Sequence, residues 1–318
     1  MTKNTFKSYA LIIASAIILT LVSMLPIGIF GVIVTALLAS TIGYTITKHH
    51  YYFVGLVCAC IFLIYMIFSG NFTSSIAAST PLILCGITLG ITYNMKFSEF
   101  VTTGVICGIY TIYSLLNIKL LDTSGEDLFK NAFALSAQDY SDMLMSLYPE
   151  QFTQAELDTL IADAMSVMMK FMPSLMIIMC GCLALLMLYV FKKVLKFTKS
   201  DITLYKPFSE WHADKSFSIM FFVIVAISFF LPDQSYIKDA IANVLFVSFF
   251  VFFIFGLSLA DFLLKRKITN SFLRRTILIL LIFFVFGTLP FILCLIGALD
   301  GFVNIREKIT KNILPKQE

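Results

Sequence analysis

The sequence predicts an all-α, polytopic bundle of transmembrane helices, and three observations lead to this prediction. Of the 318 residues, 59% are hydrophobic and only 13% are charged, and the mean hydropathy is +0.93. Apolar runs recur along the chain with the length of roughly 20 residues that a helix needs to cross a bilayer. Unpaired backbone amides are costly in lipid, and the short alternating strands of a membrane barrel are missing, so each run is expected to be helical.

Nine apolar segments are candidates for membrane crossings. The last of them contains Gly287–Pro290, which either lies within one crossing or breaks the run into a re-entrant pair. We therefore predict about eight or nine membrane segments. In chain order the candidates cover approximately residues 8–25, 27–46, 51–69, 75–94, 98–117, 171–191, 216–232, 237–263 and 273–300.

The distribution of lysine and arginine predicts a cytoplasmic N-terminus in a multi-pass protein of a bacterial plasma membrane. Positively charged loops are retained in the cytoplasm. Such charges occur at Lys48, at Lys96, after the sixth span and after the eighth, which all fall on one side. The connection at 118–170 is acidic instead, and is expected on the outer side.

The side of the C-terminus depends on how the last run crosses the membrane. A single crossing would leave the cationic tail outside, against the charge rule, whereas a re-entrant pair would return it to the cytoplasm. The stretches "GLSLADFLLKRK" at 256–267 and "GALDGFVNIREK" at 297–308 end alike, which favours a cytoplasmic tail. The residues of this helix-end motif are Gly256, Asp261, Lys265, Arg266, Gly297, Asp300 and Arg306.

The acidic connection is expected to contain two amphipathic helices. Apolar residues recur at helical spacing from Phe129 to Leu147, and a capping box, "TQAE", follows at Thr153–Glu156. The second helix continues a stripe that runs into the sixth span. The two helices lie either flat on the outer lipid surface or over the bundle as a lid.

Helix faces of different composition divide the chain into regions. Spans in the first half carry small residues four apart, which let backbones approach closely, whereas bulky phenylalanines dominate 217–255. Phenylalanine is also simply common in lipid-facing helices. We predict a compact membrane bundle at 1–195 that includes the outer insertion 118–170, a basic cytoplasmic loop at 196–215, and Phe-rich helices with a basic tail at 216–318. The small residues proposed for helix packing or partner docking are Ala10, Ala14, Gly86, Gly90, Gly104 and Gly108.

The sequence contains no recognisable catalytic or metal-binding signature. It has no P-loop, no dinucleotide-binding glycine turn, no nucleophile elbow and no HExxH. The seven cysteines lie in apolar runs, where a thiol behaves as a small hydrophobe, and the three histidines have no partners at metal-ligand spacing. Asp261 and Asp300 lie near span ends, where a structural role is expected. We expect no enzyme activity, no cofactor, no metal and no nucleic-acid partner.

Uncharged polar residues gather at the predicted outer end of the bundle. Hydroxyl, amide and phenol groups with one lysine resemble the few orienting groups of a small-molecule pocket. Ordinary interfacial polarity, an aromatic belt and a snorkelling lysine are the alternative. The candidate ligand-binding residues are Asn71, Ser75, Ser79, Thr80, Tyr110, Tyr113, Asn117 and Lys170.

The basic segment between the sixth and seventh spans interleaves lysines with aromatic and aliphatic residues such as Tyr205 and Trp211. This composition suits a segment that lies on anionic lipid. Docking of a protein partner is the other interpretation.

Several short motifs follow one another in an order that resembles a known family. They are "FMPSLMIIMCGCLALL", "KPFSEW", Asn243 and the two helix-end stretches, and together they span most of the chain. This pattern resembles the YybS-type predicted membrane proteins of Firmicutes, although the proline expected shortly after Trp211 is missing. The N-terminal bundle of that family is similar to the substrate-binding (S) components of energy-coupling-factor vitamin transporters. The resemblance implies capture of a small molecule near the outer face, and docking of a partner membrane subunit on Ala10 and Ala14.

These observations lead to two functional hypotheses. In the first, the protein binds a small molecule or helps to transport it without catalysis, and depends on separate membrane or ATPase subunits for energy. In the second, it is a non-transporting membrane scaffold or regulator that recruits a partner through its basic cytoplasmic loops. Replacing Lys196, Lys199 and Lys206 with Gln separates the two, because only the scaffold should lose its partner.

Overall fold

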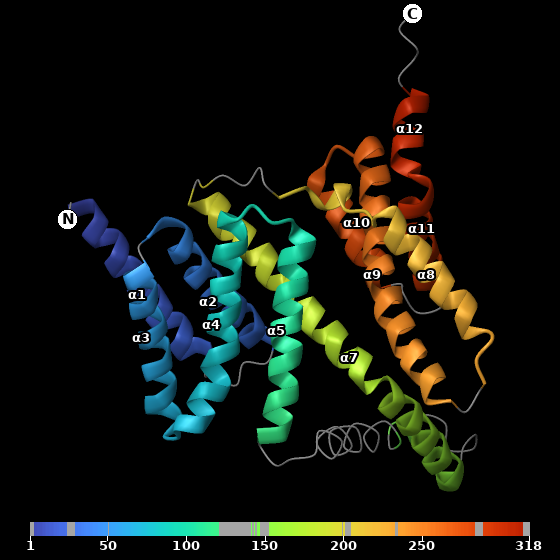
Figure 1. Ribbon diagram of the computed structural model, residues 1–318, viewed down its shortest axis with the longest axis horizontal. Coiled ribbons are helices and arrows are strands. Elements are labelled where there is room, and N and C mark those ends of the chain that lie inside the picture. The colour runs from blue at the N-terminus through green and yellow to red at the C-terminus, as the bar shows by residue number, and fades with distance from the viewer. Residues whose placement is uncertain are drawn as a thin grey trace, which may run out of the picture. The chain divides into compact units, whose positions relative to one another are not determined.

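The computed structural model describes residues 3–23, 29–49, 51–120, 141, 143, 145–146, 153–198, 200, 205–232, 235–283 and 289–313. Every regular element in these ranges is helical, which confirms the all-α prediction (Figure 1). The elements are α1 (Lys3–Ser23), α2 (Ile29–Lys48), α3 (Tyr51–Ser69), α4 (Phe72–Asn94), α5 (Glu99–Leu120), α7 (Gln154–Phe197), η1 (Phe208–Glu210), α8 (Lys215–Ser228), α9 (Tyr236–Lys267), α10 (Ser271–Phe283), α11 (Leu289–Val303) and α12 (Ile305–Ile313).

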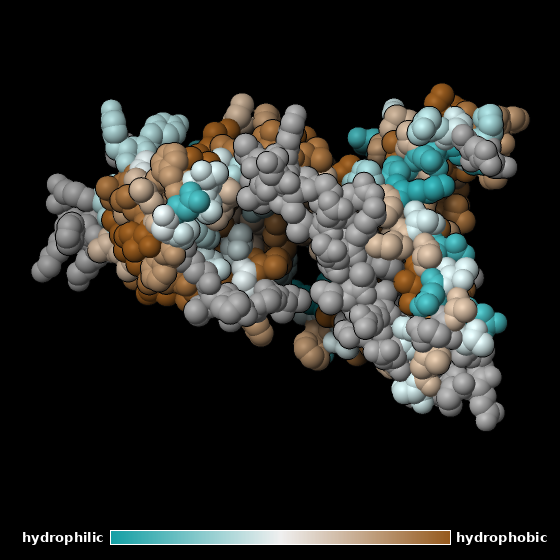
Figure 2. Space-filling model, turned by 90° about the horizontal axis from the view of Figure 1, so that it is seen from below, coloured by the Kyte–Doolittle hydropathy of each residue, from teal (hydrophilic) through white to brown (hydrophobic). Residues whose placement is uncertain are grey.

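Six of the described helices, α2, α3, α4, α5, α7 and α9, are long and apolar enough to cross a membrane. Three more apolar helices are shorter, at Tyr9–Ser23, Lys215–Ser228 and Leu289–Val303. The coarse prediction of a helical membrane protein is therefore confirmed, while the count of eight or nine membrane segments stays a prediction. Much of the surface of the N-terminal helices that Figure 2 displays is hydrophobic, as expected for helices that face lipid.

The chain forms two compact units. The N-terminal unit comprises Met1–Thr153 and Met179–Tyr205, and the C-terminal unit comprises Gln154–Ile178 and Lys206–Glu318. Helix α7 belongs to both, its first part to the C-terminal unit and its second part to the N-terminal unit. The domain boundaries near 195 and 215 that composition suggests stay a prediction.

In the N-terminal unit, α2 and α4 pack with their backbones in close contact. A Cβ atom added to Gly86 would lie 2.7 Å from Cβ of Ile42, and one added to Gly90 would lie 2.5 Å from Cβ of Ile46. Only glycine fits this crossing, because any side chain would push the helices apart. Around it, two clusters of buried apolar side chains from α1 to α5 and α7 form the core of the unit.

In the C-terminal unit, α9 and α11 pack in the same way. A Cβ at Gly256 would overlap the carbonyl group of Leu293, and one at Gly297 would overlap the carbonyl oxygen of Phe252. Phenylalanine rings fill the space beside this crossing, among them the stacked pair Phe217 and Phe252 at 5.0 Å between centroids. The phenylalanine-rich composition therefore forms a core within this unit.

The segment that the sequence analysis treats as 273–300 consists of two described helices, α10 and α11. Arg274 at the start of α10 contacts Asp261, near the end of α9, and Arg306 just after α11 contacts Ser258, in the same part of α9. The chain therefore leaves one end of α9 and returns to it. This geometry favours the re-entrant alternative, and the number of crossings that this run makes stays a prediction.

Of the two amphipathic helices expected in the acidic connection, the second is continuous with the sixth span. Helix α7 runs without interruption over 44 residues from Gln154. Most of the first expected helix lies outside the described residues.

Candidate functional site

The polar residues predicted to form an outer pocket lie mainly at the start of α4 and in the second half of α5. Ser75 and Ser79 are buried, and each hydroxyl donates to the backbone carbonyl four residues earlier at 2.7 Å. The hydroxyl of Tyr113 donates to the carbonyl oxygen of Ile76 at 3.0 Å and so joins α5 to α4. These hydroxyls have partners inside the protein, so they need no ligand to satisfy them.

The remaining members of this set lie on α4, α5 and α7. Asn71 is the exposed N-cap of α4, and Tyr110 packs beside the hydrophobic core. Thr80 is half-buried on α4, and the side chain of Asn117 lies outside the described residues. Lys170 belongs to the C-terminal unit, where its Nζ lies 4.0 Å from Oδ1 of Asp239. The outer pocket stays a prediction, and its members do not all fall in one unit.

The predicted small-residue faces differ in what surrounds them. Gly86 and Gly90 are enclosed by α2, as described above. Ala10 and Ala14 are exposed on α1, and a Cβ at Gly104 or Gly108 of α5 would meet no other atom within 4 Å. The role of Ala10, Ala14, Gly104 and Gly108 in helix packing or partner docking stays a prediction.

An ion pair that the sequence analysis did not single out lies inside the N-terminal unit. Glu99 is the first residue of α5, and its side chain is only 5% exposed. Its Oε1 lies 3.6 Å from Nζ of Lys192, near the end of α7. The available signal was a carboxylate within the apolar run 98–117, since an ionisable residue in a membrane span is a functional candidate by default.

Tyr205 completes this cluster. Nζ of Lys192 lies 5.0 Å from the centroid of the Tyr205 ring, in the arrangement of a cation–π contact. Burial, and next the neighbouring charge of Glu99, raise the pKa of Tyr205, so its phenol stays protonated at neutral pH. Both the hydroxyl of Tyr205 and Oε1 of Glu99 are buried without a hydrogen-bond partner from the described part of the chain.

This cluster, formed by Glu99, Lys192 and Tyr205, joins groups of different hydrogen-bonding character. The carboxylate accepts, the ammonium donates, and the phenol can do both. A buried polar group that lacks a partner costs about 1–3 kcal/mol. The cluster is therefore suited to hold a small polar molecule.

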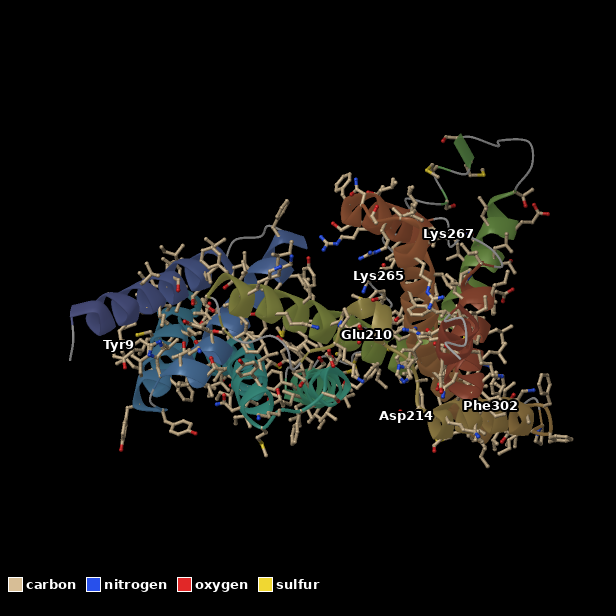
Figure 3. All side chains as sticks on the ribbon, turned by 90° about the horizontal axis from the view of Figure 1, so that it is seen from above. Tyr9, Glu210, Asp214, Lys265, Lys267 and Phe302 are labelled. Carbon is tan, nitrogen blue, oxygen red and sulfur yellow. The ribbon has the colours of Figure 1, made fainter. Side chains whose placement is uncertain are left out.

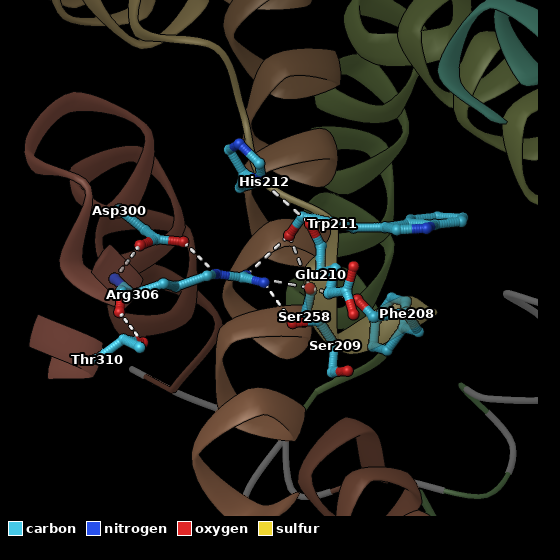
Figure 4. A network of polar contacts seen from close by, with 9 residues as sticks. All are labelled: Phe208, Ser209, Glu210, Trp211, His212, Ser258, Asp300, Arg306 and Thr310. Atoms are coloured by element: carbon cyan, nitrogen blue, oxygen red, sulfur yellow. Dashed lines mark hydrogen bonds and ion pairs between the residues drawn. The ribbon is translucent and has the colours of Figure 1, made fainter. Parts of the chain in front are cut away.

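A second polar network lies in the C-terminal unit and contains Asp300 and Arg306 of the helix-end motif (Figure 4). Nε of Arg306 donates to Oδ2 of Asp300 at 2.7 Å, and its Nη atoms donate to the carbonyl oxygens of Ser209 and Trp211 and to the hydroxyl of Ser258. The side chains of Arg306 and Asp300 are 13% and 2% exposed. The guanidinium thus ties the loop around η1 to α9 and α11.

Local backbone geometry positions this arginine. Asn304, between α11 and α12, has a φ of 53°, the left-handed conformation in which asparagine often ends a helix. The resulting turn brings the backbone N–H of Arg306 to 3.3 Å from Oδ1 of Asp300. The hydroxyl of Ser258 donates in turn toward the carbonyl oxygen of Trp211 at 2.7 Å. The side-chain polar atoms of Arg306, Asp300 and Ser258 therefore all have partners.

Asp261, Lys265 and Arg266 of the helix-end motif lie near the end of α9. Nε of Arg274 lies 2.6 Å from Oδ1 of Asp261, an ion pair between α10 and α9. Arg266 donates to the hydroxyl of Thr310 on α12 at 3.0 Å and lies over the ring of Phe262. Lys265 and Lys267 are exposed on the last turn of α9 (Figure 3).

Among known proteins, one family is similar to this chain over most of its length. The model of the family described as "Predicted membrane protein (DUF2232)" matches residues 13–300. No curated protein and no solved structure matches the chain.

Proposed function

The chain belongs to the DUF2232 family of predicted membrane proteins, and from this premise we propose that it binds a small polar molecule and helps to move it across the plasma membrane. The binding site is the cluster of Glu99, Lys192 and Tyr205. Binding takes place without catalysis, as in the S components of energy-coupling-factor transporters. The energy comes from separate ATPase subunits, because the sequence has no phosphate-binding motif.

The observation that carries this proposal is the enclosure of the Glu99–Lys192 ion pair and of the unpartnered Tyr205 hydroxyl in an otherwise apolar helical bundle. Taking charges out of water is costly, and a buried ion pair often adds nothing to stability compared with apolar residues. A membrane bundle that only needed to fold would do better with an apolar contact between α5 and α7. The charge pattern of the sequence assigns the cluster to the cytoplasmic end of the bundle, where a transported molecule would be released.

Tyr205→Phe tests the proposal because it removes only the unpartnered hydroxyl. Without ligand, the melting temperature of this variant should equal or slightly exceed that of the wild type, since an unsatisfied buried group is lost. Native mass spectrometry of the detergent-extracted protein should show a bound small molecule on the wild type. The Tyr205→Phe and Glu99→Gln variants should lose it.

Tyr189→Phe is the matched control, since Tyr189 is an exposed tyrosine on α7, the helix that carries Lys192. It should keep the bound molecule. A wild-type protein that carries no additional mass, or a Tyr205→Phe variant that carries the same mass as the wild type, contradicts the proposal.

The competing function, a scaffold that recruits a partner at the cytoplasmic face, is favoured by the Arg306 network. This network holds the loop around η1 in one conformation and leaves Lys206, His212 and Lys215 exposed. Replacing Lys196, Lys199 and Lys206 with Gln should release a partner if the protein is a scaffold. Under the transport proposal the same variant keeps its bound small molecule.

A further inference from the structure

The side chain of Asn243 on α9 contacts two backbone groups of α7 that a regular helix would join to each other. Its Nδ2 donates to the carbonyl oxygen of Lys170 at 2.9 Å, and its Oδ1 accepts from the N–H of Ser174 at 3.2 Å. In an α-helix the N–H of each residue donates to the carbonyl four residues earlier. Asn243 therefore gives each of these two groups an alternative partner.

The helix is weakened at this point by a proline. Pro173 lies inside α7, has no N–H to donate, and its ring crowds the carbonyl of the residue four positions earlier. In lipid, backbone groups freed by a proline must be satisfied by a neighbouring helix. Pro173 leaves the carbonyl of Met169 without its usual donor. Asn243 supplies an acceptor and a donor to the next pair along the helix, the N–H of Ser174 and the carbonyl of Lys170.

Pro173 lies close to the point where α7 passes from one unit to the other. Helix α7 packs with the C-terminal unit up to Ile178 and with the N-terminal unit from Met179 onwards. The proline thus lies shortly before the point where the helix passes from one unit to the other. A bend at Pro173 changes the direction in which α7 enters the N-terminal unit.

We propose that α7 can bend at Pro173 and that the hydrogen bonds of Asn243 hold the helix in one of two conformations. We call this conformation the latched state, and the hydrogen bonds of Asn243 the latch. In the latched state Asn243 bonds Lys170, Ser174 and the carbonyl oxygen of Asp239, the last at 3.0 Å. In the released state the N–H of Ser174 bonds the carbonyl of Lys170, and Asn243 keeps its bond to Asp239. The two states differ by a single hydrogen bond, so a modest interaction elsewhere can shift the balance between them.

Contacts on the N-terminal side of the proline decide which part moves. Lys170 is 4.0 Å from Asp239, and the rings of Phe171 and Phe246 lie 5.2 Å apart, so α7 is held to α9 just before Pro173. Upon release, the part of the helix after Pro173 changes direction. The latch is independent of the ligand site proposed above, since none of its residues belongs to that cluster.

A double-mutant comparison tests the latch by hydrogen exchange of peptides covering residues 169–178 in lipid nanodiscs. Asn243→Leu removes the alternative partners, and exchange should become about tenfold faster, as expected for the loss of one hydrogen bond. Pro173→Ala restores the missing N–H and the regular helix. The double variant Pro173→Ala/Asn243→Leu should therefore exchange within about twofold of the wild type.

The control is Val244→Ala, the neighbouring exposed residue of α9, which should exchange like the wild type. If the double variant exchanges as fast as Asn243→Leu alone, Asn243 acts by packing and the latch is excluded. Should Asn243→Leu fail to fold, Asn243→Asp replaces it. The aspartate still accepts from Ser174 but no longer donates to Lys170, and the same comparison applies.

Spin labels at Asp163 and Tyr189, two exposed positions on α7, report the bend directly. The wild type should give one narrow distance distribution, Asn243→Leu a broader or shifted one, and the double variant a narrow one at the distance of a straighter helix. Identical distributions in all three proteins would overturn the proposed bend at Pro173.

Discussion

At the scale of single residues, the two aspartates of the helix-end motif each pair with an arginine from the helix that follows. Asp261 pairs with Arg274, and Asp300 pairs with Arg306. Both carboxylates are buried, and each is paired with its own arginine. This arrangement gives them the structural role that their position near helix ends predicts.

Replacing Arg306 should destabilise the C-terminal unit strongly. Arg306→Gln leaves Asp300 buried without its charge partner, which typically costs about 3–5 kcal/mol. Arg306→Lys should recover little, because one ammonium cannot reproduce the planar fork that contacts Asp300, Ser209 and Trp211 together. The melting temperature of the detergent-solubilised protein measures both effects.

Lys308→Gln provides the control, since Lys308 is exposed on α12 and should be replaceable without effect. A fully stable Arg306→Lys variant would show that the fork geometry is unimportant and that charge alone holds the loop.

At the scale of helices, glycine has two different uses in this chain. Gly90 allows α4 to lie against α2, whereas Gly104 of α5 faces open space. We expect Gly90→Ala to lower stability by about 1–3 kcal/mol, as is typical of overpacking, because its Cβ would lie 2.5 Å from Cβ of Ile46. Gly104→Ala should be neutral for the isolated protein. Denaturation in mixed detergent micelles compares the two variants.

The Gly104 variant also tests partner docking. If a membrane subunit packs on the small face of α5, Gly104→Leu should abolish co-purification of that subunit while the melting temperature stays unchanged. A drop in the melting temperature of the isolated Gly104→Leu protein would instead indicate that this face is already in use within the chain.

At the scale of the whole molecule, the return of α11 to the end of α9 predicts on which side the tail emerges. Helices α10 and α11 have 13 and 15 residues, about 20 Å each, which is too short to cross a hydrocarbon core of about 30 Å. The tail should therefore emerge on the side of Lys265 and Lys267.

Cysteine labelling checks this topology. After replacement of the native cysteines, labels at Arg275 and Glu318 should react only from the cytoplasmic side, and a label at Asp139 only from outside. If a label at Glu318 reacted from outside, the run 273–300 would cross the membrane once and the re-entrant alternative would be wrong. A cytoplasmic Asp139 would reverse the orientation that the charge pattern predicts and move the Glu99 cluster to the outer end.

The sequence predicts the helices better than it predicts the residues of the candidate site. The apolar runs predict the described helices closely, for example 51–69 against Tyr51–Ser69, because helix formation in lipid depends on local composition. The site residues are harder to predict from the sequence. Glu99 and Lys192 lie far apart in the chain and come into contact only when α5 and α7 pack. Ser75 and Ser79 look available for a ligand in sequence, yet their hydroxyls bond their own helix.

The sequence by itself determined that this chain is a helical membrane protein, and its charge pattern predicts the orientation, because hydrophobicity and charge act on each segment independently of the others. Only the tertiary structure decided that the last apolar run turns back, that Asp261 and Asp300 pair with separate arginines, and that Asn243 reaches the proline of α7. Each of these features depends on contacts between helices distant in sequence, and such contacts leave no periodic signal in a single chain.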